Sequence, residues 1–131
     1  MKGIYALVIS VEKNIVVNVG ALHGIRFERG LYVYVGSAQN GIETRTARHL
    51  RKVKKRFWHI DYLLSADNVN VLKVLGKTGP RSEECKFARK LDKLGKAVKG
   101  FGSSDCNCVG HLFRLDNCEF LSRWMDELKI V

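Results

Sequence analysis

Residues 34–50, with the sequence YVGSAQNGIETRTARHL, decide the fold that we expect for this chain. The stretch begins at the end of a predicted strand, Leu31–Val35, which is rich in aromatic and β-branched residues. A loop over residues 36–41 follows, since the Asn-Gly pair at its end is a strong turn signal. A helix is then expected over Ile42–Lys55. Its residues three and four apart would form a buried stripe of Ile42, Thr46, Leu50 and Val53.

The remaining pattern adds strands and helices on both sides of this stretch. Apolar and β-branched runs predict further strands at Ile4–Val11, Ile15–Val19, Val69–Leu75 and His111–Leu115. Further helices are expected at Ile60–Leu64, at Ser82–Leu94 with Ser82 as its N-cap, and after Asp116, where the helix would carry Phe120, Leu121, Trp124 and Leu128. The pattern indicates a single α+β domain over residues 1–131, with its early strands in one antiparallel sheet.

The charge of the chain indicates an anionic partner. The 131 residues carry 23 Lys and Arg against 13 Asp and Glu, a formal net charge of +10. Such an excess favours nucleic acid over membrane surfaces and acidic proteins. No apolar run approaches the roughly 20 residues that cross a bilayer, and the first residues lack the layout of a signal peptide. Four cysteines are too few for a disulfide framework, so we expect a reduced, cytoplasmic protein.

Seven positive side chains and no acid fall between Arg45 and Arg56. Such a run is usually a solvated face. Here, however, Phe57 and Trp58 follow it directly, and aromatic rings beside cations can stack on bases while the cations neutralise phosphates. We therefore expect a nucleic-acid surface that comprises Arg48, Arg51, Lys52, Lys54, Lys55 and Trp58.

Arginine and tyrosine provide candidates for phosphodiester chemistry. Arg45 and His49 lie four residues apart and so share one face of the expected helix. The guanidinium fork can grip two phosphate oxygens and stabilise the charge of a phosphoryl-transfer transition state. Tyr5 and Tyr34 each lie on a predicted strand, and a phenol near a cation can orient or activate water. The alternatives are a solvated arginine and two half-buried strand tyrosines.

Glu84 is a candidate magnesium ligand, because Mg²⁺ is often held by one carboxylate and several waters. The alternative is a capping or helix-dipole role, since acids favour the first turn of a helix. His59 and Asp61 share a short segment that could lie near the basic helix. A histidine there could shuttle protons, but packing and local hydrogen bonds are the favoured explanation of both residues.

Cys106, Cys108 and His111 are residue types that bind zinc, and Cys118 follows them. Zinc needs four suitably placed ligands. The spacing C-x-C-x-x-H is not one of the strong zinc-finger spacings. Buried thiols are therefore the favoured interpretation.

Three segments resemble signatures of the GIY-YIG nuclease superfamily: Gly3-Ile4-Tyr5, Tyr34-Val35-Gly36 and the helix segment from Arg45 to His49. Over its whole length the chain also resembles a small, largely archaeal subgroup of uncharacterised proteins in that superfamily. Members of the subgroup occur alone or fused to a DNA-repair glycosylase of the endonuclease III kind. The runs that carry this second resemblance are Trp58–Leu64, Glu84-Cys85 and Gly102–Cys106.

The resemblance implies a three-stranded antiparallel sheet flanked by helices, and a single divalent ion, Mg²⁺ or Mn²⁺. It also implies hydrolysis of DNA phosphodiester bonds by water. Tyr5 would activate the nucleophile and Tyr34 would position water or phosphate, although the two roles can be exchanged. Arg45 would stabilise the transition state, His49 would assist by hydrogen bonding, and Glu84 would hold the metal ion.

The leading hypothesis is therefore a metal-dependent DNA endonuclease that acts in DNA repair on damaged or branched DNA. One alternative is a catalytically silent module that binds nucleic acid. Another is an adaptor that docks on a repair protein. The combination of Tyr5, Tyr34, Arg45 and Glu84 favours the nuclease, because a module that only binds has no need of all four.

Overall fold

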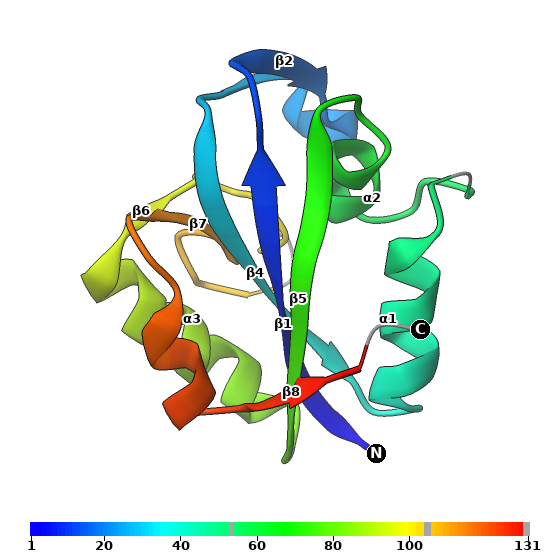
Figure 1. The fold of residues 1–131 in the computed structure, drawn as a ribbon, viewed down its shortest axis with the longest axis vertical. Coiled ribbons are helices and arrows are strands. Elements are labelled where there is room, and N and C mark those ends of the chain that lie inside the picture. Colours follow the sequence, from blue (N-terminus) through cyan, green and yellow to red (C-terminus); the bar gives the residue numbers. More distant parts are fainter. Residues whose placement is uncertain (53, 104–105, 130–131) are drawn as a thin grey trace.

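A computed structural model describes residues 1–52, 54–103 and 106–129, and its centre is one antiparallel sheet of six strands (Figure 1). The strand order is β6-β7-β4-β1-β5-β8. Three long strands form the middle: β4 (Gly30–Ala38), β1 (Gly3–Val11) and β5 (Val69–Thr78). Three short strands extend the edges: β6 (Lys96–Ala97), β7 (Leu112–Leu115) and β8 (Asp126–Leu128).

The expectation of a small sheet of about three strands is wrong, because the described residues form six. The difference lies at the edges. β6 and β8 contain two and three residues, too few to show an alternating pattern in the sequence. β8 also replaces the end of the expected terminal helix. After a 3₁₀ helix, η2 (Glu119–Arg123), the chain pairs with β5, and Leu128 packs over Gly76.

The early strands do not all join the main sheet. β2 (Ile15–Asn18) pairs with β3 (Gly24–Phe27) in a separate two-stranded sheet, which contradicts the expectation of one sheet for these strands. Only a short 3₁₀ helix, η1 (Gly20–Leu22), and two flanking residues connect them. The short connection favours local pairing as a hairpin.

Helices cover both faces of the main sheet (Figure 1). α1 (Ile42–Leu50) and α2 (His59–Leu64) pack on the face that receives Tyr5, Leu7 and Ile9 of β1. α3 (Ser82–Leu94) packs on the opposite face, which receives Ile4, Ala6 and Val8. Because β1 is buried on both faces, its sequence is almost entirely apolar.

α1 ends at Leu50, well before the expected end at Lys55. Arg51 already has an extended backbone, with ψ of 126°. The Nζ atom of Lys54 donates to the carbonyl oxygens of His49 and Arg51, at 2.8 and 2.7 Å, and so satisfies acceptors at the helix end. The buried stripe consists of Ile42, Thr46 and His49, with Leu50 half-buried, and Val53 lies outside the described residues.

The other expected elements agree closely with the structure. α3 has the predicted bounds, although Arg81 occupies the N-cap position and Ser82 is the first helical residue. α2, β5 and β7 differ from the prediction by a few residues at most. None of the helices in the described part of the chain has the length and apolar character that a membrane crossing requires.

Candidate functional site

The pairing of β1 with β4 brings the two signature segments side by side. Tyr5 lies opposite Gly36 and Leu7 lies opposite Tyr34, so both tyrosines occupy one face of the sheet. Their ring centroids are 6.3 Å apart. A Cβ atom at Gly36 would stand 2.4 Å from the Tyr5 hydroxyl oxygen. Glycine at position 36 therefore allows the Tyr5 ring to lie across β4.

A polar cleft of about 520 Å³ lies beside these tyrosines. Four of the residues that the sequence singles out for chemistry line it: Tyr5, Tyr34, Arg45 and Glu84. The fifth, His49, is buried and contacts Tyr5. The cleft wall also includes Trp58 and His59 at the start of α2. The fold therefore gathers side chains from β1, β4, α1, α2 and α3 into one site.

His49 holds the hydroxyl group of Tyr5. The His49 Nε2 atom lies 2.7 Å from the Tyr5 hydroxyl oxygen, and the ring centroids are 5.4 Å apart. Burial lowers the pKa of His49 to about 3, against the opposing effect of the Asp61 charge. His49 is therefore neutral near pH 7. A base this weak is suited to orienting the phenol rather than to taking a proton from it.

Asp61 is fully buried and accepts four hydrogen bonds. Arg48 donates through Nη1 and Nη2, at 2.8 and 3.0 Å, and the backbone N–H groups of Phe57 and Trp58 donate at 2.9 and 3.0 Å. Burial raises the pKa of Asp61, but these donors outweigh burial and the pKa lies below its ordinary value. Asp61 therefore ties α1 to the start of α2, with its Oδ1 atom 4.0 Å from His49 Nδ1.

Arg45 extends from α1 into the cleft and is held there by two contacts. Its Nη1 atom donates to the carbonyl oxygen of Ser37 at 3.1 Å. Its guanidinium carbon lies 4.5 Å from the ring centre of Trp58, and that of Arg48 lies 4.4 Å from the same ring. Arg45 is half-buried, so it is not simply one more solvated charge on a basic helix.

Burial raises the pKa of both cleft phenols. For Tyr5, the nearby positive charge of Arg45 acts in the opposite direction without overcoming burial. For Tyr34, neighbouring groups, Tyr5 and Glu84 among them, add to the effect of burial. Both phenols are therefore protonated near pH 7, and each can give up its proton only if further positive charge enters the cleft.

Glu84 lines the cleft from the first turn of α3. Its Oε2 atom lies 2.7 Å from Nδ1 of His111, close enough for an ion pair, although the imidazole nitrogen is not aligned for a hydrogen bond. A single carboxylate in a polar cleft fits Mg²⁺ or Mn²⁺, since such an ion keeps several waters.

Besides Arg45, three cations of the basic run are bound within the protein. Arg48 pairs with Asp61, and Lys52 donates through Nζ to backbone carbonyl oxygens after α2 and at the start of β5. Lys54 donates through Nζ to backbone carbonyl oxygens at the end of α1. Despite these contacts, the side chain of Lys52 is exposed overall. The same is true of the side chains of Arg51, Lys55, Arg56 and Trp58. Nucleic-acid binding by this run stays a prediction, and the run also holds the fold together.

His59 connects α2 to the loop between β6 and β7. Its Nδ1 atom accepts a hydrogen bond from the backbone N–H group of Gly102 at 2.8 Å. Burial lowers the pKa of His59, so the ring is neutral near pH 7 and carries its proton on Nε2. This hydrogen bond joins residues far apart in the sequence, not the local partners that the sequence suggested, and His59 also lines the cleft.

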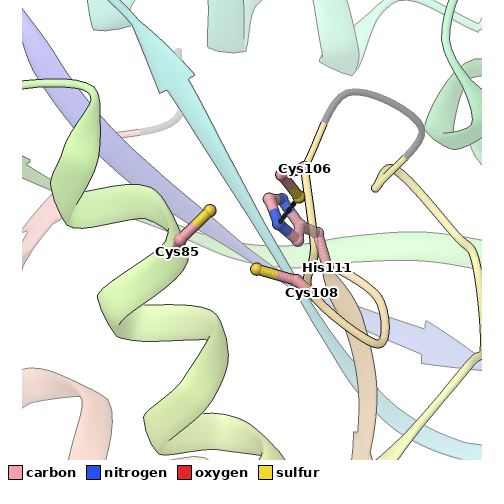
Figure 2. Close-up of side chains that lie close together, drawn as sticks. All are labelled: Cys85, Cys106, Cys108 and His111. Atoms are coloured by element: carbon pink, nitrogen blue, oxygen red, sulfur yellow. Dashed lines mark hydrogen bonds between the residues drawn. The ribbon is translucent and has the colours of Figure 1, made fainter.

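Cys85, Cys106, Cys108 and His111 form a second candidate site (Figure 2). One ligand atom from each residue lies within 4.8 Å of all the others. The Sγ atom of Cys106 is 3.4 Å from Nε2 of His111. These four residues, which we call the Cys₃His cluster, could bind a metal ion. Sequence spacing identifies only the three residues of the loop. Cys85 comes from α3, and Cys118 is not a member.

Residues 4–129 match the model of one protein family, which is described as Domain of unknown function DUF123. This range includes every residue that lines the cleft and all four residues of the Cys₃His cluster. No curated protein and no solved structure matches the chain significantly. The chain therefore belongs to the DUF123 family.

Proposed function

We propose that this protein is a metal-dependent endonuclease that hydrolyses DNA phosphodiester bonds with water. The observation that carries the proposal is the convergence of Tyr5, Tyr34, Arg45 and Glu84, from four separate elements, on one polar cleft. Packing alone does not explain an arginine and a carboxylate beside two buried phenols. The resemblance of the signature segments to GIY-YIG nucleases supports the same activity, and the suggested substrate is damaged or branched DNA.

Each group of the cleft has a distinct part in this reaction. Arg45 would donate N–H groups to the non-bridging phosphate oxygens, where negative charge develops in the transition state. Tyr5 would orient the attacking water, and His49 acts through Tyr5 as a positioning residue. Tyr34 lies on the same face of the sheet and would position water or phosphate. The roles of the two tyrosines can be exchanged.

Glu84 is the residue that would hold Mg²⁺ or Mn²⁺, through the carboxylate oxygen that does not face His111. A divalent ion bound there would supply positive charge to the phosphate and promote deprotonation of water. The raised pKa values of Tyr5 and Tyr34 fit this requirement, because neither phenol releases a proton near pH 7 on its own. Contact with His111 restricts the orientation of the Glu84 side chain.

A second candidate function is a nucleic-acid binding module without turnover. The observation that favours it is the side chain of Trp58, which is 39% exposed at the cleft and stacked against Arg45 and Arg48. Such a ring can stack on an unpaired base. This function requires a steep dependence of affinity on salt and no divalent ion. Docking on a repair protein is a further role that pull-down from nuclease-treated extract would detect.

Cleavage assays distinguish these functions. Supercoiled, flapped and four-way DNA would be incubated with Mg²⁺, with Mn²⁺ or with EDTA. We expect cleavage that depends on the ion, and a loss of about 10²–10³-fold in Arg45→Ala. Glu84→Gln should also be inactive. Arg123→Ala is the matched control, because it removes an exposed arginine outside the cleft and outside the basic run and should retain cleavage.

The result that would end the nuclease proposal is simple. The wild-type protein would cut none of these DNA forms with either ion, while binding DNA with an affinity that falls steeply as salt rises. The binding module would then be the better description. Equal cleavage by wild type and Arg45→Ala would also contradict the role of the arginine.

A further inference from the structure

We propose that the Cys₃His cluster binds one Zn²⁺ ion, which fastens the β6–β7 loop to α3, and that Glu84 is the outer partner of the histidine ligand. The β6–β7 loop is described over residues 98–103 and 106–111. In Figure 2 the sulfur of Cys85 points from α3 towards the loop, and the sulfur of Cys108 points from the loop towards α3. This inference does not depend on the proposed nuclease activity.

The donor set selects the metal. Three thiols and one imidazole are soft or borderline ligands, which suit Zn²⁺ and do not suit Mg²⁺ or Ca²⁺. All three cysteines of the cluster are free thiols in the structure, so each sulfur is available as a thiolate ligand. Four protein ligands fill a tetrahedral zinc site, and this completeness is typical of a structural rather than a catalytic zinc ion.

The distances are close to those of a formed site. With Zn–S distances of about 2.3 Å, tetrahedral geometry places the sulfur atoms about 3.8 Å apart. The ligand atoms here all lie within 4.8 Å of one another, so at most a contraction of about 1 Å is needed. Rotation of the cysteine side chains can provide such a change. The 3.4 Å contact between Cys106 Sγ and His111 Nε2 already suits two ligands of one ion.

The two nitrogen atoms of His111 face different groups. Nε2 faces the sulfur of Cys106, while Nδ1 is buried and lies 2.7 Å from Oε2 of Glu84. Histidine ligands of zinc commonly donate their second ring N–H group to a carboxylate, which fixes the tautomer and the orientation of the ring. A zinc ion on Nε2 would leave the proton on Nδ1, facing Glu84. One turn of α3 therefore supplies both a ligand, Cys85, and the orienting carboxylate.

A zinc ion that links the β6–β7 loop to α3 would stabilise an irregular part of the chain. The described residues around Cys106 and Cys108 belong to neither a helix nor a strand. The same loop contributes Gly102 to the wall of the cleft, and Gly102 donates to His59. Zinc would link this irregular segment to α3 and so hold one wall of the cleft in place. Because metal binding requires the folded arrangement, its free energy adds to the stability of the fold.

The test compares zinc binding by three forms of the full chain. Wild type, Cys108→Ser and Cys118→Ser would be purified under reducing conditions without chelator, and their zinc content measured by elemental analysis and native mass spectrometry. We expect about one zinc ion per chain in wild type and in Cys118→Ser, which alters the cysteine outside the cluster. Competition with a chelator should show far weaker binding in Cys108→Ser.

The role of Glu84 has its own readout. Glu84→Ala should keep about one zinc ion per chain but bind it roughly 10–100-fold more weakly, the usual effect of losing an outer partner. An unchanged zinc affinity would contradict the role of Glu84 whatever happens to DNA cleavage. Zinc binding without cleavage would leave this inference standing and would count only against the nuclease.

Cobalt provides a measurement on the wild-type chain alone, in case Cys108→Ser does not fold. Apo protein titrated with Co²⁺ should develop thiolate-to-metal charge-transfer bands and the strong visible absorption of a tetrahedral site. Either of two results would overturn the proposal: no such bands, or a loss of zinc in Cys118→Ser equal to that in Cys108→Ser. Iron in place of zinc would overturn the identity of the metal.

Discussion

The cleft and the Cys₃His cluster share Glu84 as a neighbour, yet they are organised in opposite ways. In the cleft, buried polar groups bind one another: the Tyr5 hydroxyl contacts His49 at 2.7 Å, and Asp61 accepts four hydrogen bonds. In the cluster, the ligand atoms lie within 4.8 Å of one another, and the contact of 3.4 Å between Cys106 Sγ and His111 Nε2 involves sulfur, a weak hydrogen-bonding atom. The cleft is assembled by strong hydrogen bonds, whereas the cluster gathers ligands whose contacts with one another are weak.

The two sites should therefore depend on different interactions, hydrogen bonds in the cleft and a metal ion in the cluster. Hydrogen bonds to a buried charged group contribute more than those between neutral groups, and a lost partner leaves the charge uncompensated. The cleft should therefore depend mainly on single protein side chains, except at the wall that contains Gly102, which zinc would hold in place. The cluster should depend on the metal ion. Substitutions on the cleft side can test this distinction, because they should change stability while leaving zinc content at its wild-type value.

The largest effect is expected for Asp61→Ala. Removal of the carboxylate leaves Arg48 without its buried partner and two backbone N–H groups without acceptors, so we expect the free energy of unfolding to fall by about 3 kcal/mol. Urea unfolding would measure this loss. Asp67→Ala is the control, since Asp67 is exposed and near in sequence, and it should change stability little. Similar losses in both variants would contradict the importance of this network.

A smaller loss is expected for Gly36→Ala. The added methyl group would overlap the Tyr5 ring and hydroxyl, so the phenol must move away from its contact with His49. Overpacking of this kind costs about 1–3 kcal/mol. In Gly24→Ala the new methyl group would meet only a side-chain carbon of Val16, at 3.6 Å. Thermal unfolding should therefore separate the two variants, and equal melting temperatures would show that the close contact at Gly36 can relax without cost.

The same contrast explains what could be predicted from the sequence. Tyr5, Tyr34 and Arg45 belong to short local segments, and strand pairing plus helical spacing brings them together. The long strands are recognisable for the same reason, because each is continuous and apolar. The edge strands β6 and β8 are not recognisable, since pairing with a neighbour defines them more than their own sequences do.

Sequence patterns could not predict the partners of residues whose contacts depend on how separate elements pack. The fourth ligand of the cluster, Cys85, is placed by the packing of α3 on the sheet, and its spacing to Cys106 matches no local motif. Asp61 is recognisable as an acid in the first turn of α2, but its partnership with Arg48 depends on how α1 and α2 meet. Likewise, Lys52 and Lys54 resemble solvated charges in the sequence and donate to backbone carbonyl groups in the structure.

The smallest predicted effect is a pH dependence from His49. In the unfolded chain its pKa is near 6.5, and in the folded protein burial lowers the pKa to about 3. Between these values the unfolded state binds the proton and the folded state does not. The stability contributed by neutral His49 is therefore complete above pH 6.5 and declines as the pH falls, by at most about 1.4 kcal/mol per pH unit.

His49→Gln isolates this effect from other titrating groups. Glutamine can still meet the Tyr5 hydroxyl, in the place of Nε2, but it does not bind a proton in this range. Urea unfolding of both proteins from about pH 7 to about pH 5 should show a steeper loss of stability in wild type, by about 1 kcal/mol per pH unit. Parallel curves would mean that the folded protein protonates His49 as readily as the unfolded chain does. The Tyr5–His49 contact would then tolerate a charged imidazole, and the cleft would be less rigidly organised than its hydrogen bonds indicate.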